Sequence, residues 1–89
     1  MEIIWDIEAN GLAYPSINKR GEPIQRAEHV WCIVAKEAGS DRVYTFNPDE
    51  IQSGIAFLNR ASLWIGHNLI GYDIPVLARC GLVRSCPVL

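Results

Sequence analysis

The sequence predicts a small α/β domain with a mixed sheet and helices packed on it, in the order β-β-β-α-β-α. Two observations predict this fold: three strand-like segments come first, and a helix, a strand and a second helix follow them. The length of 89 residues is a third observation. A chain of this size buries roughly 60% of its unfolded surface, which is enough for one modest core. We therefore expect a single domain over residues 1–89.

Composition and charge argue against several classes of protein. Hydrophobic residues make up 49% of the chain, an ordinary fraction for a globular protein. No apolar run approaches the ~20 residues of a membrane span, and nothing at the N-terminus resembles a signal peptide. The net charge of −2 argues against a free-standing binder of duplex DNA. Three cysteines without a CxxC pair make a disulfide scaffold improbable, so we expect a cytoplasmic protein.

Three strands are predicted in the first half of the chain. Residues 2–8 alternate between apolar and mostly polar side chains, which is the period of a half-buried strand. Residues 9–28 are rich in Gly, Pro and Asn and predict a long loop, of a length that is usually functional. Residues 30–36 are nearly all apolar and predict a buried strand. Residues 42–46 predict a strand that pairs with it as a hairpin.

Two helices and a fourth strand are predicted in the second half. Asn47 can cap a helix whose apolar stripe runs through residues 51–58. Residues 62–66 predict a short strand, and a polar loop follows it. Asp73 can cap the second helix at its start, and Gly81 can cap it at its end.

Two carboxylates near the end of the first strand are its most unusual feature. Asp6 and Glu8 are two residues apart, so their side chains share one face and repel each other. A divalent cation resolves that conflict, because Mg²⁺ and Mn²⁺ favour hard oxygen ligands. Two such ions ~3.5–4 Å apart activate a water and stabilise the leaving oxygen of a phosphodiester. The open alternative is that both acids simply face solvent.

Asp73 is a third candidate ligand. The strand over residues 62–66 can pair parallel to the first strand through a right-handed crossover. Asp73 then arrives near the carboxyl end of the first strand, where ligands of open α/β sheets bind. A plain N-cap is the alternative role for this residue.

Two motifs resemble those of a known enzyme family. Residues 5–12 read WDIEANGL and resemble the first motif of the DEDD-type 3′–5′ exonucleases. Residues 66–77 read GHNLIGYDIPVL and resemble the second motif of that family. Taken together, the two motifs are most similar to those of the N-terminal proofreading domain of phage-type family A DNA polymerases. The resemblance implies a ribonuclease H-like fold and hydrolysis of a DNA 3′ end with two Mg²⁺ or Mn²⁺ ions.

The resemblance also implies roles for individual residues. Asp6 matches the ligand that bridges both metals, Glu8 a ligand of the metal on the nucleophile side, and Asp73 a ligand of the other metal. These three residues are the candidate catalytic and metal-binding set. The candidate substrate-binding residues lie in the two loops beside them: Asn10, Gly11, Leu12, His67 and Asn68. Tyr72 is expected to pack rather than to act in catalysis.

One part of the family's pattern lies outside the 89 residues. The family carries a fourth acid, and a Tyr or His that positions the general base, on a helix after one more strand. Residues 85–89 fall where that strand should begin. We therefore expect the chain to correspond to roughly the first half of an exonuclease domain and to have little or no activity alone. A polymerase fragment, a remnant and one half of a split enzyme are three explanations.

The expected partners follow from the same resemblance. They are a single-stranded DNA 3′ end and a polymerase domain or second polypeptide that completes the fold, with no membrane. A homodimer through an exposed strand edge is also open. The alternative function is a catalytically dead module that binds single-stranded DNA or a protein, with Lys19, Arg20 and Arg26 meeting phosphates. An unrelated α/β interaction domain with incidental acids is the third hypothesis.

Overall fold

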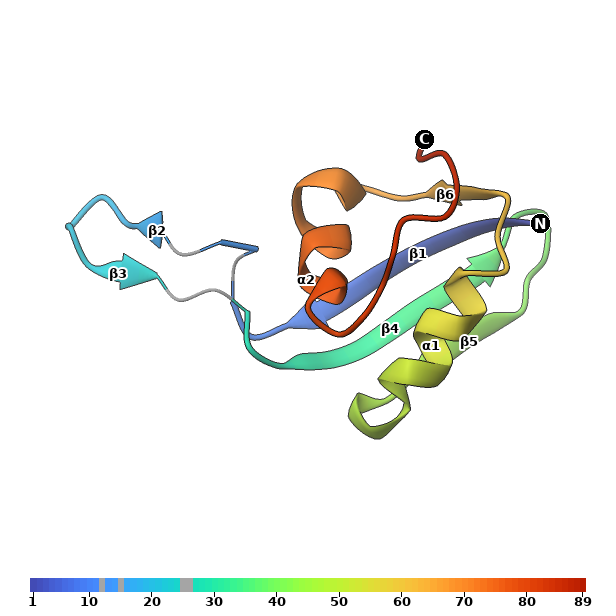
Figure 1. The fold of residues 1–89 in the computed structure, drawn as a ribbon, viewed down its shortest axis with the longest axis horizontal. Coiled ribbons are helices and arrows are strands. Elements are labelled where there is room, and N and C mark those ends of the chain that lie inside the picture. The colour runs from blue at the N-terminus through green and yellow to red at the C-terminus, as the bar shows by residue number, and fades with distance from the viewer. Residues whose placement is uncertain (12, 15, 25–26) are drawn as a thin grey trace.

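Four strands form the central sheet of the computed structural model, which describes residues 1–11, 13–14, 16–24 and 27–89. They are β1 (Glu2–Ala9), β4 (Val30–Glu37), β5 (Val43–Phe46) and β6 (Leu63–Ile65), in the order β5-β4-β1-β6. β4 runs antiparallel to both β1 and β5, and β6 runs parallel to β1 (Figure 1). The prediction of a small α/β domain with a mixed sheet is confirmed.

Two short helices cover one face of this sheet. α1 (Ile51–Leu58) follows a 3₁₀ turn (Pro48–Glu50), and α2 (Ile74–Ala78) follows a π-helical turn (Leu69–Asp73). Both helices lie over the strands on the same side (Figure 1). The sheet therefore has one packed face and one face without a helix.

The core lies between the sheet and the helices. Along β1, Ile3, Trp5 and Ile7 are buried while the residues between them are exposed, so the predicted alternation is confirmed. Trp64 of β6 is fully buried, and its Nε1–H donates to the carbonyl of Leu58 at 2.9 Å. The rings of Trp5 and Trp64 meet edge to face, with centroids 5.5 Å apart, which ties the two parallel strands together.

Residues 16–24, between β1 and β4, form a short hairpin. β2 (Ser16–Ile17) and β3 (Pro23–Ile24) pair antiparallel and form a hairpin that projects from the rest of the chain (Figure 1). We call this hairpin, residues 16–24, the arm. The prediction of a long loop over residues 9–28 is wrong for residues 16–24, because Gly21 has φ +81° and closes a tight turn between the two strands.

Two other predictions need correction. β4 is not buried on both faces, since Val34 is 37% exposed. Among the described residues no helix covers the second face of the sheet, so the continuous apolar run of this strand was a misleading signal. The second helical segment also begins earlier than the sequence indicates, because residues 69–73 form the π-helical turn instead of a polar loop.

The last residues of the chain lie beside β6. Val88 forms a parallel bridge with Trp64. The carbonyl of Pro87 accepts from the N–H of Trp64 at 3.0 Å, and the N–H of Leu89 donates to the carbonyl of Trp64 at 2.8 Å. Pro87 lacks an N–H, but its carbonyl is the group that this pairing uses. In the described ranges, every helix is too short or too polar to cross a lipid bilayer.

Candidate functional site

Asp6 and Glu8 lie on the uncovered face of β1, as their spacing predicts. Both side chains are exposed, whereas Ile7 between them is buried. Across the ladder, Asp6 faces Val34 and Glu8 faces Cys32 on β4. Because strands have a period of two, the alternation that fills the core also brings these carboxylates onto one open surface.

Asp73 joins them from the other end of the chain. Its side chain is only 2% exposed, and its Oδ2 accepts a hydrogen bond from the backbone N–H of Ile7 at 3.0 Å. β6 pairs with β1 only as far as Ile4, so no neighbouring strand faces the N–H of Ile7. The carboxylate takes the place of that strand. The prediction that Asp73 reaches the later part of β1 is confirmed.

Asp73 does not cap α2, so the N-cap alternative is wrong. Its backbone is helical, with φ −63° and ψ −45°, and its side chain makes no capping hydrogen bond. The π-helical turn has already started the helical segment before Asp73. The side chain is therefore free to face β1 instead of the amide groups of its own helix. Such turns are often found at functional sites.

Asp73 and Asp6 form an interacting carboxyl pair. Burial, and then the hydrogen bond that the protonated carboxyl of Asp73 donates to Asp6, raise the pKa of Asp73 to about 7, against the lowering effect of the N–H of Ile7. Two carboxyl groups can share a hydrogen bond only when one of them holds a proton. The pair therefore binds a proton between two groups that would otherwise repel each other.

Tyr72 lies next to all three acids. Burial raises the pKa of its phenol first, and the negative charges of Asp73, Glu8 and Asp6 raise it further. The hydroxyl donates to the carbonyl of Gly11 at 2.7 Å. This bond holds the ring in place and occupies its proton, in agreement with the expected packing role.

The acids suit Mg²⁺ or Mn²⁺ by chemistry but are not arranged as a complete ligand set. Within the described residues, no group of three or more His, Cys, Asp or Glu side chains could hold one metal ion. Asp6 and Asp73 fit as two ligands, because a cation would balance the charge that a shared proton now balances. Glu8 shares the strand face of Asp6 and would have to turn toward the pair.

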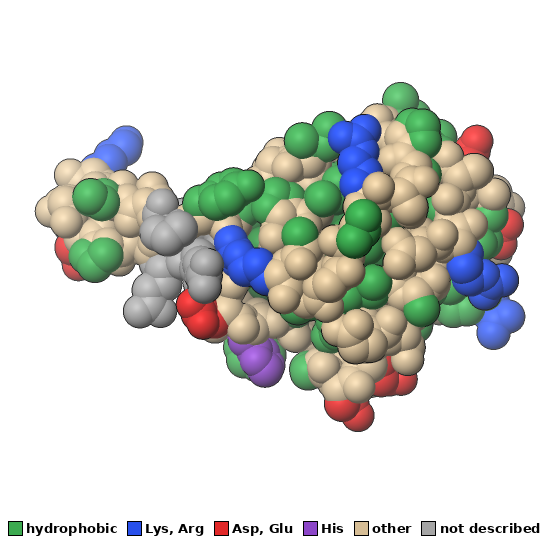
Figure 2. Space-filling view, viewed as in Figure 1, with side chains coloured by type: hydrophobic (Ala, Val, Ile, Leu, Met, Phe, Trp, Pro, Cys, Tyr) green, Lys and Arg blue, Asp and Glu red, His purple; other side chains and the backbone are tan. Residues whose placement is uncertain are grey.

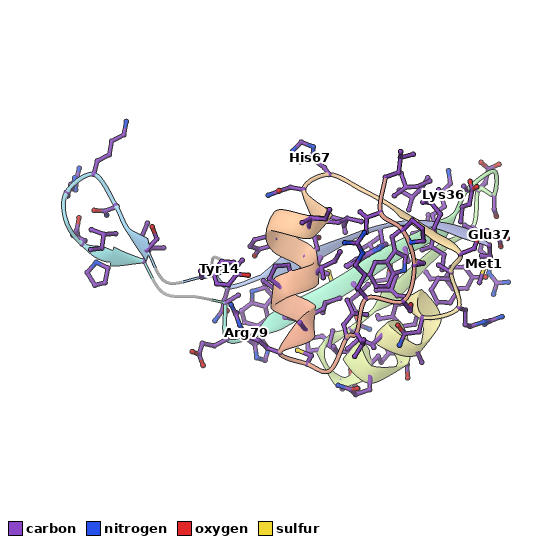
Figure 3. All side chains as sticks on the ribbon, turned by 45° about the horizontal axis from the view of Figure 1, so that its top comes forward. Met1, Tyr14, Lys36, Glu37, His67 and Arg79 are labelled. Carbon is purple, nitrogen blue, oxygen red and sulfur yellow. The ribbon has the colours of Figure 1, made fainter. Side chains whose placement is uncertain are left out.

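The loop between β6 and α2 presents the two other residues of the second motif. His67 is exposed and points away from the protein body (Figure 3). Asn68 has a left-handed backbone, with φ 55°, and a Cβ at Gly71 would collide with its side-chain amide. Glycine at position 71 therefore lets Asn68 fold over the π-helical turn. Whether either side chain contacts a substrate stays a prediction.

Asn10 and Gly11 hold the base of the arm. Asn10 Oδ1 accepts from the backbone N–H groups of Glu28 and His29, both at 2.9 Å, and the Asn10 N–H donates to the His29 carbonyl at 3.1 Å. The Asn10 side-chain carbonyl is thus occupied by the chain itself. Leu12, the third residue predicted in this turn, lies outside the described residues.

A shallow cavity of about 350 Å³ adjoins Asp6 on the open face of the sheet. This cavity was not predicted from the sequence. Ile4 was the one available signal, since it is an apolar residue on the otherwise polar side of β1. A second cavity, of about 320 Å³, is lined by Glu28, Asp49 and Cys80 and includes none of the three acids. The first cavity is lined mainly by apolar side chains with three polar ones at its rim: Ile4, Val34, Val43, Asp6, Lys36 and His67.

Comparisons with known proteins do not identify a family for this chain. No protein-family model matches the sequence, and no curated protein matches it.

Proposed function

We propose that this chain carries part of a metal-dependent 3′–5′ exonuclease site, of the kind that proofreading domains of DNA polymerases use. One observation carries the proposal: the Asp73 carboxylate accepts from the N–H of Ile7 at 3.0 Å and lies against β1 beside Asp6, although Asp6 and Asp73 are 67 positions apart in the chain. These are two of the three acids that the exonuclease-like motifs single out. Acidic residues that contribute only to solubility are not expected to lie in contact, because the repulsion between two carboxylates destabilises the folded chain.

We also propose that the fold is ribonuclease H-like. The strand order β5-β4-β1-β6, with β6 parallel to an otherwise antiparallel set, supports this proposal. The parallel bridge at Val88 supports it as well, since a further parallel strand beside β6 is what the resemblance implies. The chain would then contribute the first-strand and second-motif acids to a site that a later segment or another polypeptide completes.

The proposed metals are Mg²⁺ or Mn²⁺, held first by Asp6 and Asp73. When bound, such ions supply an activated water and stabilise the leaving oxygen of the phosphodiester. Asp6 offers its carboxylate from the open face, where a DNA 3′ end can approach. Asp73 is fixed by the N–H of Ile7 and cannot swing away from the pair. Glu8 lies toward the end of the strand, on the side of the arm.

A thermal-shift titration with Mn²⁺ tests the proposal. At about ten times the dissociation constant, binding stabilises the folded chain by about 1.4 kcal/mol, which corresponds to roughly 6–11 °C for a domain of this size. We expect Asp6→Asn to remove this response, because it deletes the exposed member of the pair. The matched control is Asp41→Asn, which removes an exposed acid from the turn before β5.

Two results would contradict the proposal. One is a wild-type chain whose midpoint does not change with Mn²⁺, and the other is an Asp41→Asn variant that loses the response as fully as Asp6→Asn. Hydrolysis is measured separately, with oligonucleotides labelled at either end, in the presence of Mn²⁺. Release of mononucleotides from the 3′ end alone is the expected polarity, and its rate reports how much of the site the chain supplies.

The second candidate is a ribonuclease H-like module that binds single-stranded DNA or a protein without cutting. Its support is the lack of a complete ligand set among the described residues. Oligonucleotide binding that does not depend on Mn²⁺, together with no metal response, is the outcome that favours this candidate over the exonuclease.

A further inference from the structure

The arm is electrically different from the rest of the molecule. Residues 16–24 hold two basic residues, Lys19 and Arg20, and one acidic residue, Glu22. The arm therefore carries +1, while the remainder of the chain carries −3. Figure 2 shows basic atoms projecting from the upper side of the arm and acidic atoms on its lower side.

The turn of the arm is organised by its own backbone and by Asn18. Asn18 Oδ1 accepts from the N–H groups of Arg20 at 2.9 Å and Glu22 at 3.0 Å, and the N–H of Gly21 donates to the carbonyl of Asn18 at 3.0 Å. The Glu22 carboxylate accepts from Asn18 Nδ2 at 3.3 Å. No side chain of Lys19 or Arg20 is needed to form this turn.

Both basic side chains at the tip are available to a ligand. Lys19 and Arg20 are exposed, and among the described residues neither side chain makes a hydrogen bond or an ion pair. The one acid of the arm, Glu22, is engaged with Asn18 instead. A pair of unpaired cations on a preorganised turn is suited to the phosphates of a flexible polyanion.

The base of the arm is tied to the segment that carries Asp73. The Tyr72 hydroxyl donates to the Gly11 carbonyl at 2.7 Å, and Arg79 Nη1 donates to the Ala27 carbonyl at 2.8 Å. Figure 3 shows Arg79, which directly follows α2, and Tyr14 near this base. The chain therefore enters and leaves the arm beside the segment that carries Asp73.

We propose that the arm is a guide for single-stranded nucleic acid, in which Lys19 and Arg20 contact phosphates of the strand whose end lies at the acid pair. The inference rests on the proposed function for its choice of partner. It goes beyond that function because it assigns a separate binding surface outside the two motifs. The cations hold the backbone without reading its sequence, as phosphate contacts do.

The test is binding of a fluorescent sixteen-nucleotide oligothymidylate to the full chain at about 50 mM salt, with EDTA present so that metal plays no part. We expect the double variant Lys19→Gln/Arg20→Gln to weaken binding at least about fivefold. It should also reduce the slope of log K against log salt by roughly 1.4, which is about 0.7 for each lost phosphate contact.

The matched control is Arg42→Gln/Arg60→Gln, which removes the same charge at the opposite end of the sheet. Arg42 precedes β5 and Arg60 follows α1, close to the N-terminal end of β1. We expect less than a twofold change for this variant. Thermal midpoints of both variants are measured to show that each one folds.

Three outcomes overturn the inference: no binding by the wild-type chain, unchanged binding by the arm variant, or equal losses in the arm and control variants. The Mn²⁺ titration is independent of all three. Loss of the metal response with arm-dependent binding intact would contradict the exonuclease and leave the guide standing. A normal metal response together with oligonucleotide binding that does not depend on the arm would contradict the guide and leave the exonuclease standing.

Discussion

The two faces of the central sheet use the same strands for different purposes. On one face, Ile3, Trp5 and Ile33 are almost completely buried beneath α1 and α2. On the other face, Ile4 and Val34 are 39% and 37% exposed and Asp6 stands in the open. Neighbouring residues in the chain thus lie in opposite environments.

This difference shows how a small domain can combine a core with charged groups. Burial stabilises the first face by roughly 25 cal/mol for each Å² of apolar surface. That stabilisation offsets the cost of holding Asp73 beside Asp6, where one carboxyl must be protonated or bind a cation. The open face contributes little to stability, so charged side chains such as Asp6 can occupy it at little cost.

The largest expected effect compares two adjacent residues of β4. Ile33→Ala should lower the free energy of unfolding by about 2–5 kcal/mol, because Ile33 is fully buried and its loss leaves a cavity. Val34→Ala should cost less than about 1 kcal/mol, because its side chain already meets solvent. Urea denaturation of both variants gives the two values.

Should Ile33→Ala fail to fold, Ile33→Val replaces it, with an expected cost of about 0.5–1.5 kcal/mol. Equal costs for the substitutions at 33 and 34 would show that something covers the second face in solution. The comparison of the two faces would then fail.

The second effect is a pH dependence that comes from the acid pair. The pKa of Asp73 is raised to about 7 in the folded chain, from 3.8 for a free carboxyl, so between these values the folded state binds more protons than the unfolded state. Stability should therefore be highest near pH 4 and fall as the pH rises to about 7. The slope cannot exceed about 1.4 kcal/mol per pH unit for this group.

Urea denaturation at several pH values with EDTA measures this slope, and Asp73→Asn is the comparison. The amide can still accept from the N–H of Ile7 but does not titrate. The variant should lose the fall in stability between pH 4 and 7. An unchanged slope in Asp73→Asn would mean that another group causes it.

The smallest effect separates the two tryptophans of the packed face. Trp64 Nε1–H donates to Leu58, whereas Trp5 Nε1–H is buried and has no hydrogen-bond partner among the described residues. Both Trp→Phe variants lose similar volume, but only Trp64→Phe loses a hydrogen bond. It should therefore be less stable than Trp5→Phe by about 1 kcal/mol. Equal midpoints in urea would contradict this difference.

The strands of the sheet could be predicted because their signals are local. Alternation along residues 2–8 identifies β1 and puts Asp6 and Glu8 on one face, and no other part of the chain is needed for this. The pairing of β4 with β5 follows from a short turn between two apolar segments. Repulsion between the two acids was likewise visible in their spacing.

The arm and the uncovered face of β4 could not be predicted in the same way. An apolar run cannot reveal whether a helix covers one or both faces, and Val34 is exposed because α1 and α2 lie on the same side. Trp31 is exposed for another reason, since the register of β4 against β1 shifts between Cys32 and Val30. The hairpin of the arm has strands of only two residues each. Its signal is therefore too short to distinguish it from a loop.

The sequence alone determined the order of the four strands of the central sheet and the two helices, the position of Asp6 and Glu8 on one strand face, and the choice of Asp73 as a candidate ligand. Only the tertiary structure decided what Asp73 does. From its position before a helix, Asp73 could equally cap that helix or lie beside Asp6 on β1. The π-helical turn starts the helix earlier, and β6 ends before Ile7, so the carboxyl completes the edge of β1 beside Asp6. That choice depends on where a parallel strand ends, which no local pattern records.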